Sequence, residues 1–174
     1  MVTLYIAQSL DGYIADVDGG IGWLDTVAAE GEDYGYEAFM AGVDALVMGR
    51  ATYDQVRGFG AWPYGERSTA VLTSRPPDDD PPAGVTFMSG APDSVLQAFP
   101  KNAHVWLVGG AGVIDAFQRA DAIDRYVISV VPTLLGDGIP MFRAGRQERA
   151  LRLTGSKSFP SGLAQLTYER PRPA

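Results

Sequence analysis

The sequence predicts an α/β fold with a mostly parallel central sheet, antiparallel C-terminal edge strands and helices on both faces. Up to residue 120, apolar runs typical of strands alternate with segments of helical spacing, which favours parallel strands joined by helices. After residue 125, three strand-like runs follow one another, which favours an antiparallel edge. With 174 residues and 46% hydrophobic content, the chain is long enough for one well-cored domain over residues 1–174 and too short for two.

Each element is predicted from its local pattern. Apolar or alternating runs bounded by turn residues predict strands at 2–8, 45–48, 68–73, 85–88, 104–108, 125–131, 151–158 and 164–169, and a turn at 9–12 leads into residues 13–15. Helical spacing predicts helices at 33–40, from 49 onward, at 92–99 and at 111–120. The turn-rich segment 16–22 is predicted to be a loop, and so is the proline- and aspartate-rich segment 76–82, after which the strand pattern resumes at once.

Composition argues against several classes of function. The chain has no cysteine, which excludes disulfides and thiol chemistry, and its single histidine leaves little for a zinc site, so we expect no metal centre. The net charge of −7 argues against nucleic-acid binding, which needs a basic surface. No apolar run approaches the roughly 20 residues of a membrane helix, and residues 1–7 resemble a strand rather than a signal peptide. We therefore expect a cytoplasmic protein without a membrane partner.

The acidic residues are distributed unevenly. Residues 1–49 contain no lysine or arginine, whereas the rest of the chain contains 14 basic and 12 acidic residues. Solvated loop and helix positions are the simplest explanation for the nine acids of the first segment, which are Asp11, Asp16, Asp18, Asp25, Glu30, Glu32, Asp33, Glu37 and Asp44.

Two strand-to-helix junctions carry the main functional signal. The apolar run 105–108 meets the glycine-rich segment 109–112 and continues with helical spacing, and the run 45–48 meets Gly49 in the same way. Glycine lets the backbone approach a ligand closely, and ligands of open α/β sheets bind at the carboxyl ends of strands. Because helix N-termini attract phosphate, two such junctions suit the pyrophosphate of a dinucleotide. A tight turn whose glycines serve only geometry explains either junction alone.

Polar side chains near the strand ends favour a phosphorylated cofactor. Arg50 adds a positive charge and Thr52 a hydroxyl group at the first junction, and Ser74 and Arg75 follow the strand predicted at 68–73. Guanidinium groups bind phosphate through two parallel hydrogen bonds. An adenosine 2′-phosphate is therefore plausible, which indicates NADP rather than NAD.

Five short segments occur in an order that matches a known family. They are Ala7-Gln8-Ser9-Leu10-Asp11-Gly12-Tyr13-Ile14-Ala15, Met48-Gly49-Arg50-x-Thr52-Tyr53, Leu72-Thr73-Ser74-Arg75, Val108-Gly109-Gly110-Ala111 and Val130-Val131-Pro132-Thr133-Leu134-Leu135-Gly136-Asp137-Gly138-Ile139-Pro140-Met141-Phe142. Together they resemble the dihydrofolate reductase-like superfamily, in the branch that contains the reductase domain of bacterial riboflavin biosynthesis (the RibD C-terminal domain) and its stand-alone relatives. The last segment is similar to that branch rather than to true dihydrofolate reductases.

The resemblance implies a dihydrofolate reductase-like fold, bound NADPH and a homodimer. It implies a cofactor site between the two junctions with a cis peptide at Gly109-Gly110, and with the loop from Asp11 to Trp23 bordering the nicotinamide and the substrate. The cofactor-binding residues it implies are Ala7, Gly49, Arg50, Thr52, Ser74, Arg75, Gly109, Gly110, Ala111, Gly112 and Val113.

Reduction of a C=N or C=O group often needs a proton source, for which a buried carboxyl group with a raised pKa is the natural candidate. By comparison with dihydrofolate reductases, counting back from Met48 places this catalytic acid at Asp33, which a solvated helix N-cap explains equally well. Glu37, one helical turn later, is a second candidate on the substrate side. Asp11 is another, although a turn explains it more simply, and Trp23 suits either stacking on a heterocycle or filling the core.

Charge then limits the substrate. The riboflavin intermediate carries a phosphate and folates carry a glutamate tail, and both need cations that residues 1–49 do not supply. The sequence therefore predicts an NADPH-dependent reductase of a neutral or cationic small molecule, either a heterocycle or a carbonyl compound. The alternatives are the riboflavin-pathway 5-amino-6-(5-phosphoribosylamino)uracil reductase itself and a catalytically silent nucleotide-binding module.

Overall fold

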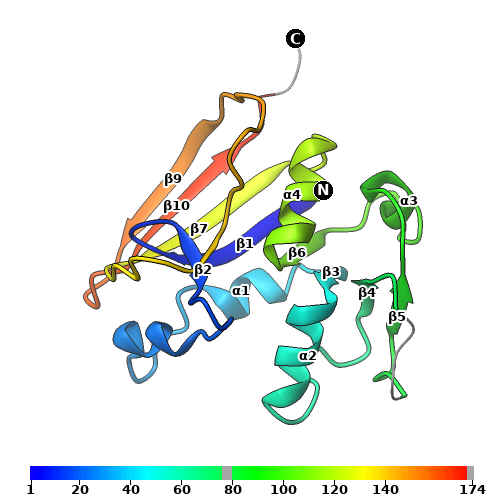
Figure 1. The fold of residues 1–174 in the computed structure, drawn as a ribbon, viewed down its shortest axis with the longest axis horizontal. Helices are drawn as coiled ribbons and strands as arrows, with labels where there is room; N and C mark the ends of the chain where they lie inside the picture. The colour runs from blue at the N-terminus through cyan, green and yellow to red at the C-terminus, as the bar shows by residue number, and fades with distance from the viewer. Residues whose placement is uncertain (76–79, 172–174) are drawn as a thin grey trace.

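The computed structural model describes residues 1–75 and 80–171 and centres on an eight-stranded sheet (Figure 1). Residues 76–79 of the predicted loop 76–82 lie outside the described residues. The strands are β1 (Val2–Ser9), β3 (Ala45–Gly49), β4 (Ser68–Leu72), β5 (Val85–Met88), β6 (Val105–Gly109), β7 (Arg125–Val131), β9 (Arg152–Ser158) and β10 (Ala164–Glu169).

The order of the strands in the sheet is β5-β4-β3-β6-β1-β7-β10-β9. The first six strands of this order are parallel to one another, and β10 is antiparallel to both β7 and β9. The mostly parallel sheet with an antiparallel C-terminal edge is therefore confirmed.

Helices cover both faces of the sheet, as the sequence predicts. They are α1 (Tyr36–Met40), α2 (Arg50–Gly58), α3 (Pro92–Leu96) and α4 (Ala111–Arg119). Alternate residues of a strand point to opposite faces, so Val47 packs with α3 and α4 whereas Met48 packs with α1 and α2. Burial of both residues explains the uninterrupted apolar run at 45–48. None of the helices in the described ranges is long and apolar enough to cross a membrane.

The short elements depart from the prediction. A 3₁₀ helix, η1 (Gly22–Val27), follows the loop at residues 16–21. The short strand β2 (Tyr13–Ala15) pairs with β8 (Ile139–Pro140), and no local sequence pattern predicts this pairing. Helix α1 begins at Tyr36 rather than at residue 33, because Tyr34 and Gly35 have φ values of +56° and +83° that an α-helix does not accept. Helix α3 ends at Leu96, before the predicted residue 99.

The connections of two neighbouring strands position the site. Helix α2 follows β3 and helix α4 follows β6, and β3 and β6 lie side by side in the sheet. Because the two helices pack on opposite faces, a crevice opens between their first turns at the carboxyl ends of these strands.

Candidate functional site

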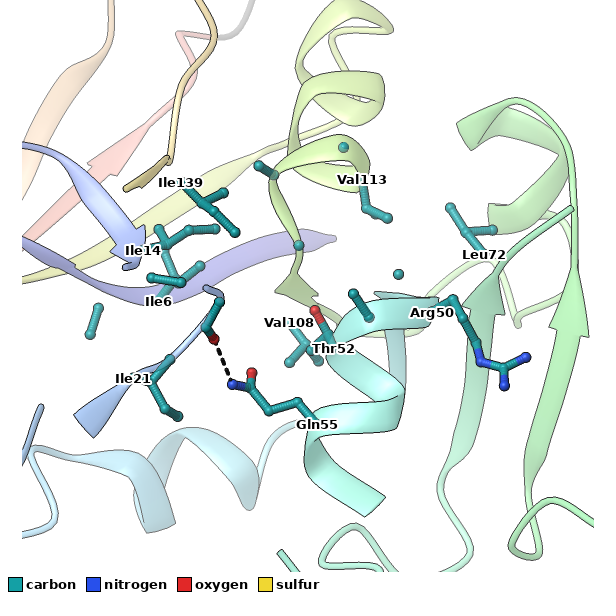
Figure 2. A pocket seen from close by; sticks show the side chains of 18 of the residues that line it. Ile6, Ile14, Ile21, Arg50, Thr52, Gln55, Leu72, Val108, Val113 and Ile139 are labelled. Carbon is teal, nitrogen blue, oxygen red and sulfur yellow. Dashed lines mark hydrogen bonds between the residues drawn. The ribbon is translucent and has the colours of Figure 1, made fainter. Parts of the chain in front are cut away.

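A cavity of about 860 Å³ occupies the crevice between the first turns of α2 and α4 (Figure 2). Its volume lies within the range of small-molecule and cofactor sites. Isoleucines, among them Ile6, Ile14 and Ile139, form one end, and the glycine-rich helix starts form another part of the wall. Eight residues predicted to bind the cofactor line it: Ala7, Gly49, Arg50, Thr52, Gly110, Ala111, Gly112 and Val113.

The two helix starts approach each other closely because their junction residues lack side chains. A Cβ atom on Gly49 would lie 3.2 Å from Cγ2 of Val113, and one on Gly110 would lie 3.2 Å from Oγ1 of Thr52. In the described structure neither helix has a side-chain hydrogen bond at its N-cap residue, so no side chain competes with a ligand for the first N–H groups. The cavity wall therefore presents the positive ends of two helices.

The expected cis peptide between Gly109 and Gly110 is wrong, since no peptide bond among the described residues is cis. The chain instead turns through φ values of +137° at Gly109 and +58° at Gly110, both in the region that favours glycine. Gly109 itself is not among the residues that line the cavity. A Cβ atom placed on Gly109 would lie 3.3 Å from Cδ1 of Ile6.

Two arginines line the cavity in different ways. The Nε of Arg50 donates to a carboxylate oxygen of Asp54 at 2.7 Å, and its guanidinium lies 5.7 Å from the centre of the Phe87 ring, so it points toward β5 (Figure 2). Arg143, which the sequence reasoning missed, lies beside the start of α4, with Nη2 4.0 Å from the place of a Cβ on Gly112. Arg143 is thus a second cation at the cavity.

Ser74 and Arg75 do not line the cavity in this structure. They are exposed and follow β4, whose last residue, Leu72, does line it. The structure therefore brings the two helix starts together as predicted. Ser74 and Arg75 lie just beyond the carboxyl end of β4, outside the cavity lining.

The loop at residues 16–21 borders the cavity and is hydrogen-bonded to α2. The side-chain amide of Gln55 donates to the backbone oxygen of Gly19 at 2.9 Å, drawn as the dashed line in Figure 2. A carboxylate oxygen of Asp16 accepts from the N–H groups of Asp18 and Gly20, which holds the loop in a tight turn. Gln55 was not predicted as a site residue.

A smaller cavity of about 240 Å³ adjoins the first, since Ala7 and Leu24 line both. Polar groups of β1, β7 and the segment before α1 line this cavity, and Gln165 on β10, which is not part of the lining, hydrogen-bonds to them. The side-chain amide of Gln165 donates at 3.1 Å to the hydroxyl of Ser129 and to the backbone oxygen of Tyr34, which also accepts from the Tyr5 hydroxyl at 3.1 Å. Ser129 pairs with Ala7 on β1 and with Gln165 on β10, so Ala7 and Ser129 of the lining belong to one row of residues on a single face of the sheet.

Asp33 lines the smaller cavity, but it lacks the burial and the raised pKa expected of a proton donor. Its carboxylate is exposed and accepts from the backbone N–H groups of Glu37 and Gly35, each at 2.8 Å. These hydrogen bonds hold the pKa of Asp33 below its ordinary value. The expectation of a carboxyl with a raised pKa is therefore wrong here. Asp33 is not the N-cap residue of α1 either, since Gly35 has that position; its hydrogen bonds hold the turn that precedes the helix.

Three further predicted substrate-side residues lie outside both cavities. Asp11 accepts from the hydroxyl of Ser9 at 2.6 Å and from the N–H of Gly136 at 2.7 Å, so it ties two loops together as a turn residue. Trp23 packs against a small core cluster, which supports its core-filling alternative. Glu37 is exposed on α1.

Residues 62–165 match the family model described as the RibD C-terminal domain. The chain belongs to this family. It is similar to a solved structure of a putative riboflavin biosynthesis protein from Shewanella sp. PV-4, with 35% identity, a TM-score of 0.86 and coverage of 98% of this chain and 99% of that one. It is also 40% identical over 170 residues to the Bacillus subtilis (strain 168) protein YwjB, covering 96% of each chain.

A more distant relative supports the fold alone. The diaminohydroxyphosphoribosylaminopyrimidine deaminase/5-amino-6-(5-phosphoribosylamino)uracil reductase of Thermotoga maritima has a TM-score of 0.74 at 15% identity, covering 98% of this chain and 56% of that one. The RibD C-terminal domain family member described here therefore has a dihydrofolate reductase-like fold and spans just over half the length of that protein.

Proposed function

We propose that the protein is an NADPH-dependent reductase that transfers a hydride to a small heterocyclic or carbonyl compound. The observation that carries the proposal is the meeting of two glycine-lined helix starts, at Gly49 and Gly110, on one cavity of about 860 Å³. Membership of the RibD C-terminal domain family supports a reductase.

The residues present fit a dinucleotide with an extra phosphate. We assign the pyrophosphate to the first N–H groups of α2 and α4, together with the Thr52 hydroxyl and the guanidinium of Arg143. Arg50 follows β3, and Ser74 and Arg75 follow β4. We assign these three residues to the adenosine 2′-phosphate, and to bind it Arg50 gives up part of its contact with the carboxylate of Asp54.

When bound, NADPH supplies a hydride, which carries two electrons to the acceptor carbon, while one proton goes to the adjacent nitrogen or oxygen and NADP⁺ remains. The isoleucine-lined end of the cavity, formed by Ile6, Ile14 and Ile139, excludes water from the reacting atoms. Ala7 and Leu24 line both this cavity and the smaller one. The proposal needs the acceptor in direct contact with the nicotinamide at this end of the larger cavity.

Two alternatives each have an observation in their favour. Family membership and the reductase name of the Thermotoga maritima relative favour 5-amino-6-(5-phosphoribosylamino)uracil reductase. The lowered pKa of Asp33 favours a catalytically silent nucleotide-binding module, because a carboxyl that stays ionised is a poor proton donor.

Fluorescence titration with NADPH and NADH tests the proposal first. We expect NADPH to bind about tenfold more tightly than NADH, since charge-assisted hydrogen bonds to the 2′-phosphate contribute about 1.5–3 kcal/mol. Absence of binding by either nucleotide contradicts every reductase assignment. Binding without oxidation of NADPH across a panel of heterocycles and carbonyl compounds supports the silent module instead.

Steady-state assays with the phosphoribosylamino uracil substrate separate the two enzymatic assignments. Turnover with a kcat of roughly 1 s⁻¹ or more identifies the riboflavin-pathway reductase. The homodimer implied by the resemblance stays a prediction, and sedimentation velocity measures it: a single 18.6 kDa species would contradict it.

A further inference from the structure

We propose that a third cavity, formed between helix α4 and residues 143–149, binds inorganic phosphate. This arginine-lined cavity has a volume of about 200 Å³. It is lined by Gln118, Arg119, Gly145, Arg146, Gln147 and Arg149, none of which lines the larger or the smaller cavity. The inference is independent of the proposed function, because none of these lining residues is assigned to NADPH.

Residues 143–149 run along α4 from its first turn to its end (Figure 1). The Nε of Arg146 donates to the carboxylate of Asp115, in the middle of the helix. The Nη1 of Arg149 donates to the carboxylate of Asp121, two residues past the end of the helix. The segment therefore encloses the arginine-lined cavity at the end of α4, away from the first turn where the larger cavity opens.

Positive charge exceeds negative charge around this cavity. Asp115 is buried, and three guanidinium groups approach its carboxylate, one from α4 and two from residues 143–149. In all, five guanidinium groups share three carboxylates among the described residues here: Arg119, Arg143, Arg146, Arg149 and Arg170 with Asp115, Asp121 and Asp124. In a chain with a net charge of −7, this local excess of positive charge attracts an anion.

The three arginines of the lining keep N–H groups for a ligand. Arg146 and Arg149 each donate one hydrogen bond to a carboxylate among the described residues, and Arg119 contacts one at 3.3 Å. Because a guanidinium has five N–H donors, the others can donate to the oxygens of an anion while these ion pairs persist. The described lining contains no aspartate or glutamate that would repel the anion. The cavity therefore suits an oxyanion, which arginine binds through directed hydrogen bonds.

Gln118 distinguishes phosphate from other oxyanions. Its side-chain oxygen is buried and accepts no hydrogen bond from any residue that the structure describes. A buried acceptor without a donor is a position where a bound ion or water supplies the missing hydrogen bond. At neutral pH inorganic phosphate keeps a P–OH group that can donate to this oxygen, whereas sulfate and carboxylates are fully ionised and have no such donor. Gln118 therefore favours phosphate.

The size and exposure of the cavity suit a single small ion. Its volume of about 200 Å³ lies below the range of sites for cofactors and drug-sized ligands, which favours inorganic phosphate over a nucleotide. The side chains of Arg146 and Arg149 are 29% and 28% exposed, so solvent and salt screen their charges only in part. The side chain of Arg119 is 61% exposed, which leaves the cavity open to an ion from solution.

Isothermal titration calorimetry of the full chain with phosphate and with sulfate, at equal ionic strength and neutral pH, tests the inference. We expect saturable phosphate binding, and sulfate binding at least about fivefold weaker, because sulfate cannot donate to Gln118. Arg149→Gln should weaken phosphate binding about fivefold to tenfold, since it removes a partly shielded guanidinium. Arg152→Gln removes the same charge from an exposed position outside the cavity and should change the affinity less than about twofold.

Gln118→Leu tests the selectivity by itself. It should lower phosphate affinity to the level of sulfate and leave sulfate affinity unchanged. If sulfate binds the unaltered protein as tightly as phosphate does, or if phosphate shows no saturable binding, the inference is overturned.

Equal effects of Arg149→Gln and Arg152→Gln also overturn it, because phosphate then binds elsewhere. Should Arg149→Gln fail to fold, NMR of the arginine Nε–H groups of the unaltered protein keeps the test. Phosphate should shift the signals of Arg146 and Arg149 and leave that of Arg152 in place, and the reverse pattern contradicts the site.

Discussion

Replacing Gly110 by alanine tests whether the close approach of the two helix starts builds the larger cavity, where we propose that NADPH binds. Gly110 has a φ of +58°, and a Cβ atom there would lie 3.2 Å from Oγ1 of Thr52. The left-handed conformation costs a residue with a side chain about 1–2 kcal/mol, and the crowded contact adds about 1 kcal/mol. We expect the free energy of unfolding to fall by about 2–3 kcal/mol, which lowers the Tm by about 4–12 °C for a chain of this length.

Two further variants separate the conformational cost from the contact. Gly136 also has a positive φ, of +77°, but no atom lies within 4 Å of a Cβ placed on it, so Gly136→Ala should cost only the first 1–2 kcal/mol or so. Thr52→Ala in the Gly110→Ala background removes the crowded oxygen and should restore about 0.5–1 kcal/mol in a double-mutant cycle.

Urea unfolding followed by circular dichroism measures the stabilities, and fluorescence titration measures NADPH affinity on the same samples. The added methyl group projects into the space between the helix starts, so Gly110→Ala should also weaken NADPH binding, while Gly136→Ala should not. If Gly110→Ala is no less stable than Gly136→Ala and binds NADPH as tightly as the unaltered protein, the glycine contact does not build the cavity.

Three other changes test the surroundings of the cavity. Arg143→Gln should raise the Kd for NADPH about threefold to tenfold, and the difference should shrink at high salt, because an exposed guanidinium is screened. Gln55→Leu removes the hydrogen bond to Gly19 and should speed NADPH dissociation several-fold in stopped-flow measurements; an unchanged rate would mean that the loop does not retain the cofactor. Asp115 is buried and hydrogen-bonded by Arg146, which lowers its pKa. Its stabilisation is therefore complete above the unfolded pKa of about 3.9 and is lost as the pH falls through the lower folded pKa, so Asp115→Asn should flatten the fall in Tm below about pH 4.

The sequence predicts the regular part of the fold well because each central strand is buried on both faces. An unbroken apolar run such as 45–48 is then required by the fold itself, and it is visible without any knowledge of its neighbours. The pairing of β2 with β8 has no such signal, since it joins residues 13–15 to residues 139–140. The late start of α1 follows from the backbone conformation of Tyr34, which no local propensity predicts for a tyrosine.

The candidate site likewise contains residues that local sequence patterns predict and residues that they do not. The helix starts at Gly49 and Gly110 could be predicted because glycine at a strand end has a local and recognisable cause. Arg143 and Gln55 could not, because nothing in their own segments indicates that a distant loop and the side of α2 meet the cavity. The resemblance predicts Asp33 on the substrate side, and only its hydrogen bonds to the N–H groups of Gly35 and Glu37 reveal that it holds the turn before α1.

The larger and the smaller cavity differ in how far family membership predicts what they bind. At the two helix starts the wall of the larger cavity is formed by glycine backbone at Gly49 and Gly110, so the dinucleotide contacts proposed there depend little on side chains. The wall of the smaller cavity includes side chains such as Tyr5 and Ser129, brought together by the neighbouring strands β1 and β7, so single substitutions there would change the shape and polarity of the cavity more than the fold. Relatives of this chain should accordingly share the cofactor more widely than the substrate. The side chains that line this chain's own cavities therefore weigh more in choosing a substrate than the name of any relative does.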